Sequence, residues 1–242
     1  MVVVDKVVRR FGPVMACAGV SFAAPEKSVT VLLGPNGAGK STVLGVVSGR
    51  LMPHGGDALV EGASVSANPI GVRALTGSVA EDQAFPDCVT ARGFLRFACS
   101  LRLVPRRDRD AEVSRVAELC SVTDVLNRPA RELSRGYRRR LALAGALVSD
   151  PPVLVLDEPT AGLDPAQLAG FRELVRSLAQ TKTVILSTHI LSEAEAVADR
   201  IVVIAEGLVR AEGSVDEIRG QDGLERAFLR LVEATPAAEA PR

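Results

Sequence analysis

The sequence predicts an α/β protein in which a mostly helical insertion interrupts a sheet core. In the second half of the chain, strand-like runs alternate with helical stretches at residues 153–156, 165–179, 183–186, 191–198 and 201–204. Strands that alternate with helices in this way indicate a parallel sheet with covered faces. Between about residues 91 and 149 the pattern is helical, because apolar residues such as Val113, Val116 and Leu119 share one helical face.

The first half of the chain opens with strand-like runs separated by turns, at residues 2–8, 19–23 and 28–33. The last of these runs is apolar and β-branched and ends at a glycine, as expected of a buried strand. A helix is predicted over residues 39–50, and a short strand at residues 58–60 follows a turn-rich piece. Another helix is predicted over residues 134–148, with Ser134 well placed as its N-cap.

The composition is that of an ordinary folded protein. The chain has 242 residues, of which 47% are hydrophobic and 24% charged, so it can form one large domain or two small ones. Its 29 basic and 29 acidic residues balance, which argues against a dedicated nucleic-acid binder. The arginines of the helical insertion are expected to coat its surface, namely Arg102, Arg106, Arg107, Arg109 and the run Arg138, Arg139, Arg140.

Nothing in the sequence predicts a membrane span, a secretion signal or a metal-binding cysteine cluster. No apolar run approaches the roughly 18 residues that a membrane-spanning helix needs, and the N-terminal residues lack the order of a secretion signal. Any role at a membrane is therefore expected to come through a partner. The cysteines form no CxxC pair, which predicts free core thiols in a reducing cytosol at Cys17, Cys88, Cys99 and Cys120.

A glycine-rich loop follows the predicted buried strand at residues 28–33. Residues 34–42 read GPNGAGKST and fit the pattern G-x-x-x-x-G-K-[ST], with a predicted helix directly after them. The glycines let successive N–H groups point at phosphate oxygens, and the helix N-terminus adds partial positive charge. Lys40 can reach the outer phosphates, and the Ser41 hydroxyl can hold Mg²⁺. The predicted nucleotide contacts are Gly34, Pro35, Asn36, Gly37, Ala38, Gly39, Lys40, Ser41 and Thr42.

An acidic pair complements this loop. Asp157 and Glu158 directly follow the hydrophobic run at residues 153–156, so both carboxylates are expected at the carboxyl edge of the sheet. Asp157 can bind Mg²⁺ directly or through water. Glu158, beside the expected γ-phosphate, can polarise the attacking water. The loop and the pair together predict a Mg²⁺-dependent NTPase.

The segment between these elements resembles a known family. Residues 133–165 read LSRGYRRRLALAGALVSDPPVLVLDEPTAGLDP and resemble the block of ATP-binding cassette (ABC) ATPases that runs from the LSGGQ signature through the acidic pair to the D-loop. The motif STHI at residues 187–190 resembles the switch-histidine motif, with His189 as the histidine. Phe11 resembles the aromatic residue that stacks on adenine. The resemblance covers nearly the whole chain and identifies it as similar to the nucleotide-binding subunit of an ABC transporter.

The resemblance implies a fold and a domain organisation. The fold would be a P-loop NTPase core with a mixed or parallel sheet, an N-terminal antiparallel β part and a helical insertion. A single ABC ATPase domain would cover residues 1–233, with a flexible tail at residues 234–242. Within it, the sheet core would comprise residues 1–83 and 150–233, and the helical subdomain residues 84–149.

The signature segment predicts a second anion site. Ser134 and Gly136 open a helix, whose free N–H groups and dipole attract an anion. The resemblance implies that this site, with Asp164 of the D-loop, closes over ATP bound to another copy, which gives a head-to-tail dimer. Arg135 and Tyr137 depart from the LSGGQ pattern. Because Ser134 and Gly136 are kept and Arg135 adds a cation near an anionic ligand, we expect a working composite site.

The Q-loop residue stays open between two candidates. The family places a glutamine at the junction between the sheet core and the helical insertion, where residues 77–95 read GSVAEDQAFPDCVTARGFL. Gln83 has the expected identity and is the predicted nucleotide and Mg²⁺ contact. Glu81 fits almost as well by its distance from the preceding strand.

The predicted function is that of a motor subunit. A homodimer or a paired cassette would bind ATP and Mg²⁺, hydrolyse ATP through Lys40, Glu158 and His189, and power export through a separate transmembrane permease, without nucleic acid. The chain would be cytoplasmic and peripheral on the inner face of the cell membrane. Residues 212–233 resemble the tails of bacterial exporter subunits.

Two alternatives are weighed against this function. One is a soluble ABC-type ATPase that acts on a ribosome or on DNA. Such relatives usually carry two cassettes or long coiled coils, and neither occurs in these 242 residues. The other is a non-catalytic nucleotide-sensing module, which the presence of Glu158 and His189 disfavours.

Overall fold

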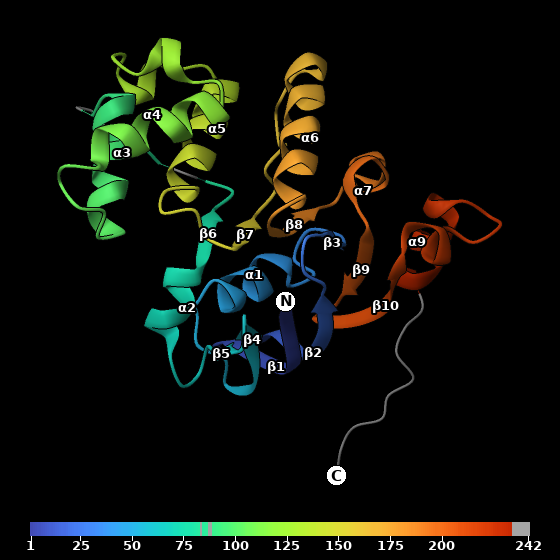
Figure 1. Ribbon diagram of the computed structural model, residues 1–242. Helices are drawn as coiled ribbons and strands as arrows, with labels where there is room; N and C mark the ends of the chain where they lie inside the picture. Colours follow the sequence, from blue (N-terminus) through green and yellow to red (C-terminus); the bar gives the residue numbers. More distant parts are fainter. Residues whose placement is uncertain (83, 87–88, 234–242) are drawn as a thin grey trace.

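The computed structural model describes residues 1–82, 84–86 and 89–233. The strands form two sheets, a four-stranded sheet of order β2-β1-β4-β5 and a six-stranded sheet of order β10-β9-β3-β8-β7-β6. In Figure 1, helices α3, α4 and α5 gather on one side of the larger sheet, and the smaller sheet lies below α1. The α/β architecture with a helical insertion is therefore present.

The smaller sheet is antiparallel. Its strands are β1 (Val2–Phe11), β2 (Val14–Ala24), β4 (Gly55–Val60) and β5 (Ala63–Ser64). A tight turn joins β1 to β2, and Gly12 in it has a φ of 55°, a left-handed conformation that glycine adopts without strain. The N-terminal antiparallel part that the family resemblance implied is confirmed, although β1 and β2 extend beyond the runs predicted at residues 2–8 and 19–23.

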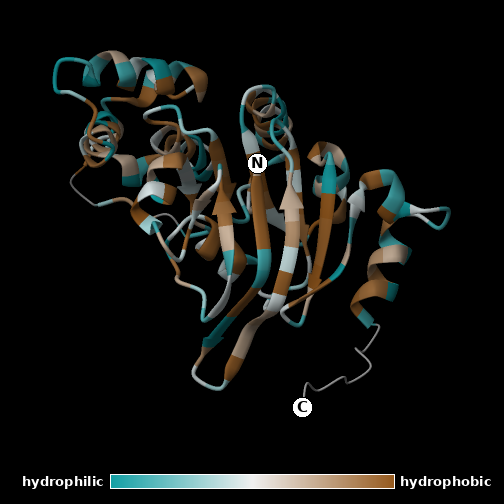
Figure 2. Cartoon of the chain, turned by 60° about the horizontal axis from the view of Figure 1, so that its bottom comes forward, coloured by the Kyte–Doolittle hydropathy of each residue, from teal (hydrophilic) through white to brown (hydrophobic). Residues whose placement is uncertain are grey.

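The larger sheet is mixed. Its parallel strands are β3 (Val29–Leu33), β6 (Thr76–Val79), β7 (Val153–Leu156), β8 (Thr183–Thr188) and β9 (Arg200–Ala205). The edge strand β10 (Leu208–Ser214) pairs antiparallel with β9. β3 and β7 are buried along their whole length, which explains their continuous apolar sequences. Figure 2 shows apolar colours along the central strands.

Helix α1 (Lys40–Val47) lies between the two sheets. It contacts β1, β2 and β4 of the smaller sheet and β7 and β8 of the larger one. The side chains that it buries in the core shared with both sheets are Val43, Leu44, Val46 and Val47. Because α1 starts at the end of the glycine-rich loop, the core fixes the position of that loop.

A second core lies on the other face of the larger sheet and continues into the helical region. That region contains α3 (Ala91–Leu101), α4 (Arg109–Leu119), η1 (Thr123–Val125), η2 (Ala130–Glu132) and α5 (Arg135–Ala146). The remaining helices of the second half are α6 (Pro165–Ala179), α7 (Leu191–Val197), α8 (Val215–Arg219) and α9 (Leu224–Glu233). None of the helices in the described part of the chain has the length and hydropathy that crossing a bilayer requires.

Helix α2 (Pro69–Leu75) lies in a stretch for which the sequence pattern predicted no helix. Its start is nevertheless well formed, because Asn68 Oδ1 accepts a hydrogen bond from Gly71 N at 2.9 Å and proline stands at the first helical position. β6 follows directly and reads only TGSV. It is a strand because it pairs with β7 at the edge of the larger sheet.

Two arginines of the helical region, Arg102 and Arg139, reach the sheet core, so the expectation that they coat the surface is wrong. The expectation is confirmed for the exposed residues Arg106, Arg107 and Arg138. Arg102 Nη1 donates to Arg73 O at 2.7 Å, and Arg102 Nη2 donates to Thr76 O. Arg139 Nη1 donates to Ala80 O at 3.2 Å. Burial lowers the pKa of both guanidinium groups. These arginines therefore fasten the helical region to the segments around β6.

The cysteines that the structure describes are buried free thiols, as predicted: Cys17, Cys99 and Cys120. Burial raises the pKa of Cys17 to about 11 and that of Cys120 to about 12. Both thiols are therefore protonated near neutral pH and behave as small core residues. Cys88 lies outside the described residues.

Candidate active site

The glycine-rich loop connects β3 to α1, and close packing requires its glycines. A Cβ atom on Gly34 would lie 2.1 Å from Ile204 O, and one on Gly39 would lie 2.3 Å from Ala16 O. Gly37 and Gly39 have φ angles of 81° and 103°, which strain residues that carry a side chain. The loop therefore runs tightly between β2 and β9 and presents the N-terminus of α1, where N–H groups lack partners within the helix.

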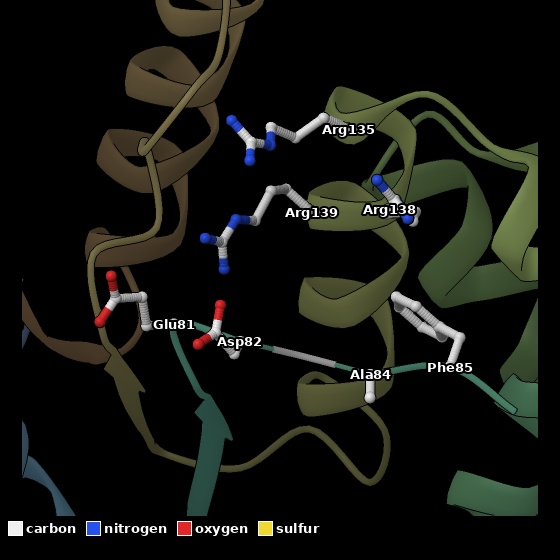
Figure 3. A pocket seen from close by; sticks show the side chains of 7 residues that line it. All are labelled: Glu81, Asp82, Ala84, Phe85, Arg135, Arg138 and Arg139. Atoms are coloured by element: carbon white, nitrogen blue, oxygen red, sulfur yellow. The ribbon is translucent and has the colours of Figure 1, made fainter.

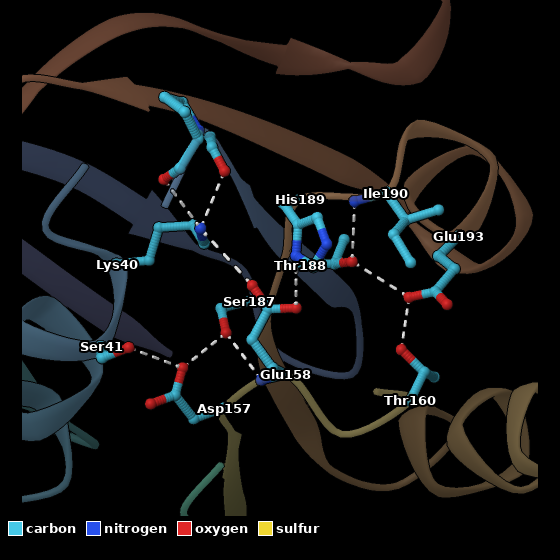
Figure 4. Close-up of polar contacts among 12 residues, drawn as sticks. Lys40, Ser41, Asp157, Glu158, Thr160, Ser187, Thr188, His189, Ile190 and Glu193 are labelled. Carbon is cyan, nitrogen blue, oxygen red and sulfur yellow. Dashed lines mark hydrogen bonds and ion pairs between the residues drawn. The ribbon is translucent and has the colours of Figure 1, made fainter. Parts of the chain in front are cut away.

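Lys40, the first residue of α1, is buried under the loop. Its Nζ donates to Gly34 O at 2.8 Å and to Pro35 O at 3.1 Å. The same atom lies 3.4 Å from Glu158 Oε1, as Figure 4 shows. The ammonium group thus stands between the loop and the acidic pair, where it can bind an anion together with the loop N–H groups.

Asp157 and Glu158 leave β7 at the carboxyl edge of the larger sheet. Ser41 Oγ donates to Asp157 Oδ1 at 3.1 Å, and Ser187 Oγ donates to the same oxygen at 2.7 Å. Glu158 N donates to Ser187 Oγ at 2.9 Å. The sequence prediction did not include Ser187, although it is the first residue of the STHI motif. Its hydroxyl fixes both acidic residues to the end of β8.

Ser41 and Asp157 fit a Mg²⁺ site. Hydroxyl and carboxylate oxygens suit this cation, which usually takes one or two carboxylates from the protein and completes its shell with water and substrate phosphates. No group of three or more histidine, cysteine or acidic side chains in the described part of the chain could hold a metal ion by itself. A sparse oxygen donor set of this kind is typical of Mg²⁺ bound together with a nucleotide.

His189 follows β8 and faces Glu158. The Nδ1 atom of His189 lies 3.1 Å from Glu158 Oε2. Glu158 itself has a φ of 42°, a left-handed conformation that costs energy for a residue with a side chain and that clusters at functional sites. The two carboxylate oxygens of Glu158 therefore face different partners, Lys40 on one side and His189 on the other.

Behind His189, a buried carboxylate joins two segments of the site. Glu193 Oε2 in α7 accepts hydrogen bonds from Thr160 Oγ1 and, at 3.0 Å, from Thr188 Oγ1. Ile190 N donates to Thr188 Oγ1 at 3.1 Å. The sequence prediction included neither Glu193 nor the two threonines. The available signal was weak, namely an acidic residue in the first turn of a predicted helix.

A cavity of about 330 Å³ lies over the glycine-rich loop, which is large enough for a small-molecule ligand. Its lining includes residues 36–42, Glu158 and His189, and also Val14, Met15 and Glu81. The structure thus brings the predicted loop, Lys40, Ser41, Glu158 and His189 to one cavity. Asp157 joins them through its contact with Ser41.

Of the predicted nucleotide contacts, Phe11, Gly34 and Pro35 are not among the described residues that line this cavity. Phe11 at the end of β1 is 45% exposed, and the Arg9 guanidinium carbon lies 4.9 Å from the centre of its ring. Val14 and Met15 of β2 line the cavity instead. Gln83 lies outside the described residues.

The signature segment lies away from the phosphate-loop cavity. Ser134 is the N-cap of α5, as predicted, and its Oγ accepts from Tyr137 N at 3.4 Å. A Cβ atom on Gly136 would lie 2.5 Å from Gln167 Oε1, and Gln167 N donates to Asp164 Oδ1 at 2.9 Å. Ser134, Gly136 and Asp164 are therefore neighbours at the junction of α5 and α6, but they do not line the phosphate-loop cavity.

A second cavity, of about 260 Å³, lies between α5 and the segment after β6. Arg135, Arg138 and Arg139 line its α5 side, and Glu81 and Asp82 line the opposite side, as Figure 3 shows. Glu81 lines both cavities. The segment after β6 therefore connects the phosphate-loop cavity to the signature helix.

Comparison with known proteins identifies the family. Residues 17–161 match the family model described as ABC transporter. The chain belongs to the ABC transporter family. A solved structure titled as the ATP-binding subunit of an ABC transporter matches with a TM-score of 0.85 and 24% identity over 96% of this chain and 99% of that one. A dimeric bacterial ABC transporter cassette matches with a TM-score of 0.80 and 22% identity over 88% of this chain and 98% of the other. These likenesses confirm the predicted fold class.

Curated relatives of the ABC transporter family match most of this chain. A daunorubicin resistance ATP-binding protein of Streptomyces coeruleorubidus is 37% identical over 96% of this chain and 74% of its own length. The Nod factor export ATP-binding protein I of Burkholderia orbicola is 39% identical over 85% of this chain and 68% of its own length. The ABC transporter A family member 1 of Dictyostelium discoideum is 33% identical over 90% of this chain, which spans only 25% of that relative. The chain thus corresponds to an ATP-binding cassette, as the motifs predicted.

Proposed function

We propose that this chain binds ATP with Mg²⁺ and hydrolyses it as a head-to-tail dimer to power export through a separate transmembrane permease. The observation that best supports the proposed hydrolysis is the position of the Glu158 carboxylate. Its Oε1 lies 3.4 Å from Lys40 Nζ and its Oε2 lies 3.1 Å from His189 Nδ1, at the wall of the phosphate-loop cavity.

Each group at the cavity has a role that its chemistry suits. Lys40 and the loop N–H groups bind the phosphates. Ser41 and Asp157 would hold Mg²⁺, which would offset the negative charge of the phosphates. Glu158 accepts a proton from the attacking water. His189, beside it, orients the γ-phosphate and the water by hydrogen bonding.

The remaining predicted contacts complete this proposal. Residues 34–42 surround the phosphates, and Phe11 stacks on adenine from the end of β1. The Q-loop contact to Mg²⁺ and the attacking water comes from Gln83 or from Glu81, and the position of Glu81 in the cavity wall supports the second choice.

The dimer follows from the separation of the two half-sites. Ser134, Gly136 and Asp164 lie away from the cavity that contains Lys40, so a second copy, or a paired cassette, supplies them. The fold neighbour described as a dimeric cassette supports this arrangement. In the proposed domain, residues 84–149 form the helical subdomain that carries the signature, and residues 1–83 and 150–233 form the core. The predicted tail at residues 234–242 lies outside the described residues.

Export is the proposed direction because of the relatives. One relative is named for Nod factor export and another for daunorubicin resistance. Neither name refers to a ribosome or to DNA, and no nucleic-acid partner is proposed. The cassette would act on the cytoplasmic side, peripheral to the inner face of the membrane, next to a separate permease.

The test is a Glu158→Gln variant of the full chain. Phosphate release should fall by about 100-fold or more, while ATP binding is retained and Mg·ATP converts the variant to a dimer in size-exclusion chromatography. Glu195→Gln, an exposed acid of α7, is the matched control and should hydrolyse ATP at the wild-type rate. Full hydrolysis by Glu158→Gln contradicts the assigned base. A Glu158→Gln protein that stays monomeric with Mg·ATP, both alone and with its membrane partner, contradicts the dimer.

A further inference from the structure

Glu193 closes a ring of contacts around the two residues proposed to act on the attacking water. Thr160 lies two positions after Glu158 in the chain, and its hydroxyl donates to Glu193 Oε2. The same oxygen accepts from Thr188, which directly precedes His189. His189 Nδ1 in turn lies 3.1 Å from Glu158 Oε2. Figure 4 shows the complete ring.

We propose that Glu193 is a positioning residue for ATP hydrolysis. It fixes the segment after Glu158 to the end of β8 and thereby holds Glu158 and His189 against each other. It acts through Thr160 and Thr188 and does not touch the nucleotide itself. This inference rests on the proposed hydrolysis at this site.

The end of the strand pairing explains why such a link is needed. β7 and β8 pair in parallel as far as Leu156 and Leu186. Beyond these residues the relative position of the two segments depends on side-chain contacts. Ser187 provides one such contact, because its hydroxyl donates to Asp157 Oδ1 and accepts a hydrogen bond from Glu158 N. Glu193 provides another contact, which joins Thr188, one residue after Ser187, to Thr160, two residues after Glu158.

Packing alone does not account for a carboxylate at this position. Glu193 is 6% exposed, and burying a carboxylate is costly unless hydrogen bonds compensate. Its neighbours Ala194 and Val197 on α7 are buried apolar residues of the main core, and an apolar residue often stabilises a buried site at least as well as a charged one. The carboxylate is therefore explained by its two hydroxyl donors, Thr160 and Thr188.

The test compares Glu193→Ala with Glu195→Ala in the full chain. Both substitutions remove one acid from α7, but Glu195 is exposed. For Glu193→Ala, kcat should fall about tenfold or more with the KM for ATP within about twofold of wild type, because the catalytic pair is misplaced while the phosphate loop is untouched. Glu195→Ala should leave both parameters unchanged. Glu193→Gln should regain most of the rate, since an amide oxygen can accept from both threonines.

A double-mutant cycle examines the route of the effect. Thr160→Val and Thr188→Val each remove one donor to Glu193 and should lower kcat. If the carboxylate acts through these hydroxyls, adding either change to Glu193→Ala lowers kcat no further. If the reductions in kcat of the two single variants multiply in the double variant, the threonine and Glu193 act independently, and the positioning role of Glu193 is overturned. Should Glu193→Ala fail to fold, Thr160→Val and Thr188→Val test the same contacts through their own effects on kcat.

The remaining outcomes separate this inference from the proposed function. If the Glu193→Ala variant melts at a lower temperature yet keeps the wild-type kcat at a temperature where it is folded, Glu193 has a purely structural role. That result would overturn this inference alone. A wild-type chain that binds Mg·ATP but releases no phosphate, alone or with its membrane partner, overturns the proposed function as well.

Discussion

His189 Nδ1 lies 3.1 Å from Glu158 Oε2, although the two residues follow different strands of the larger sheet. β7 and β8 are parallel neighbours, so their carboxyl ends meet at the same edge. The N-terminus of α1 reaches this edge as well, because Ser41 donates to Asp157 there. The crevice at the carboxyl ends of parallel strands is where open α/β sheets bind ligands, and this chain places its reactive groups there.

Replacing His189 is predicted to slow hydrolysis without weakening nucleotide binding. In His189→Ala, kcat should fall about tenfold to 100-fold, because Glu158 loses a hydrogen-bond partner at the reacting centre. The affinity for a fluorescent ATP analogue should stay near that of wild type, since Lys40 and the loop are unchanged. The chain has two histidines, and the exposed His54 supplies the control, His54→Ala. Equal phosphate release by both variants would contradict the role of His189.

Ser187 is predicted to control the Mg²⁺ requirement through Asp157. Its hydroxyl donates to Asp157 Oδ1 at 2.7 Å, and loss of such an orienting partner typically costs about tenfold to 100-fold in metal affinity. A Mg²⁺ titration of phosphate release at fixed ATP should therefore shift by about tenfold in Ser187→Ala. Ser100→Ala on α3, where the hydroxyl donates to the helix carbonyl of Arg96, should not shift. Superimposable titrations of Ser187→Ala and wild type would rule out the orienting role.

Arg102 is predicted to stabilise the junction between the helical region and the sheet core. In Arg102→Met the carbonyl oxygens of Arg73 and Thr76 lose their donor, and the free energy of unfolding should fall by about 2 kcal/mol. Urea unfolding followed by circular dichroism measures this loss. Arg106→Met, at an exposed position, should change the free energy by less than about 0.5 kcal/mol. If both variants lower the free energy of unfolding by a similar amount, Arg102 contributes no more than an exposed surface residue.

The Glu112–Arg115 pair predicts a defined pH dependence of stability. Hydrogen bonds from Arg115 are the largest cause that holds the pKa of Glu112 below its ordinary value, and a hydrogen bond from Ser149 N adds to them against the opposing effect of burial. A carboxyl pKa that is lower in the folded than in the unfolded state stabilises the protein above the unfolded pKa. This contribution disappears as the pH falls through the folded pKa.

Glu112→Gln should therefore lower the free energy of unfolding near pH 7 and converge with wild type as the pH falls through the lowered folded-state pKa of Glu112. Urea unfolding at several pH values measures the difference. Glu118→Gln, at an exposed position of the same helix, should follow the wild-type curve. A difference between Glu112→Gln and wild type that stays constant over this range would exclude the ionised pair as its source.

The parts of the site proposed to contact phosphate were predictable because their chemistry restricts local sequence. Gly34 and Gly39 leave no room for a Cβ atom, and Lys40 follows them at the start of a helix. Similarly, Asp157 and Glu158 end an apolar run that could only be a buried strand. In each case, the physical requirement can be recognised from the residue type and from its neighbours in the sequence.

Residues that act through distant partners were not predictable in this way. Ser187, Glu193 and Arg102 look ordinary in sequence, as a serine in a motif, an acid in a first helical turn and an arginine on a helix. Their roles arise from contacts with groups about 25 to 35 residues away along the chain, such as the 30-residue separation from Ser187 to Asp157. The role of Phe11 stays a prediction, because Phe11 is not among the described residues of the cavity wall, which include Val14 and Met15 from the next strand.

Within one chain, the signature helix and the glycine-rich loop open onto different cavities. In the proposed dimer, a copy that carries a damaged Ser134 would therefore spoil its neighbour's pocket and leave its own intact. Mixed with normal copies, such a subunit therefore forms dimers that keep one intact pocket, made by its own glycine-rich loop and by Ser134 of the normal copy.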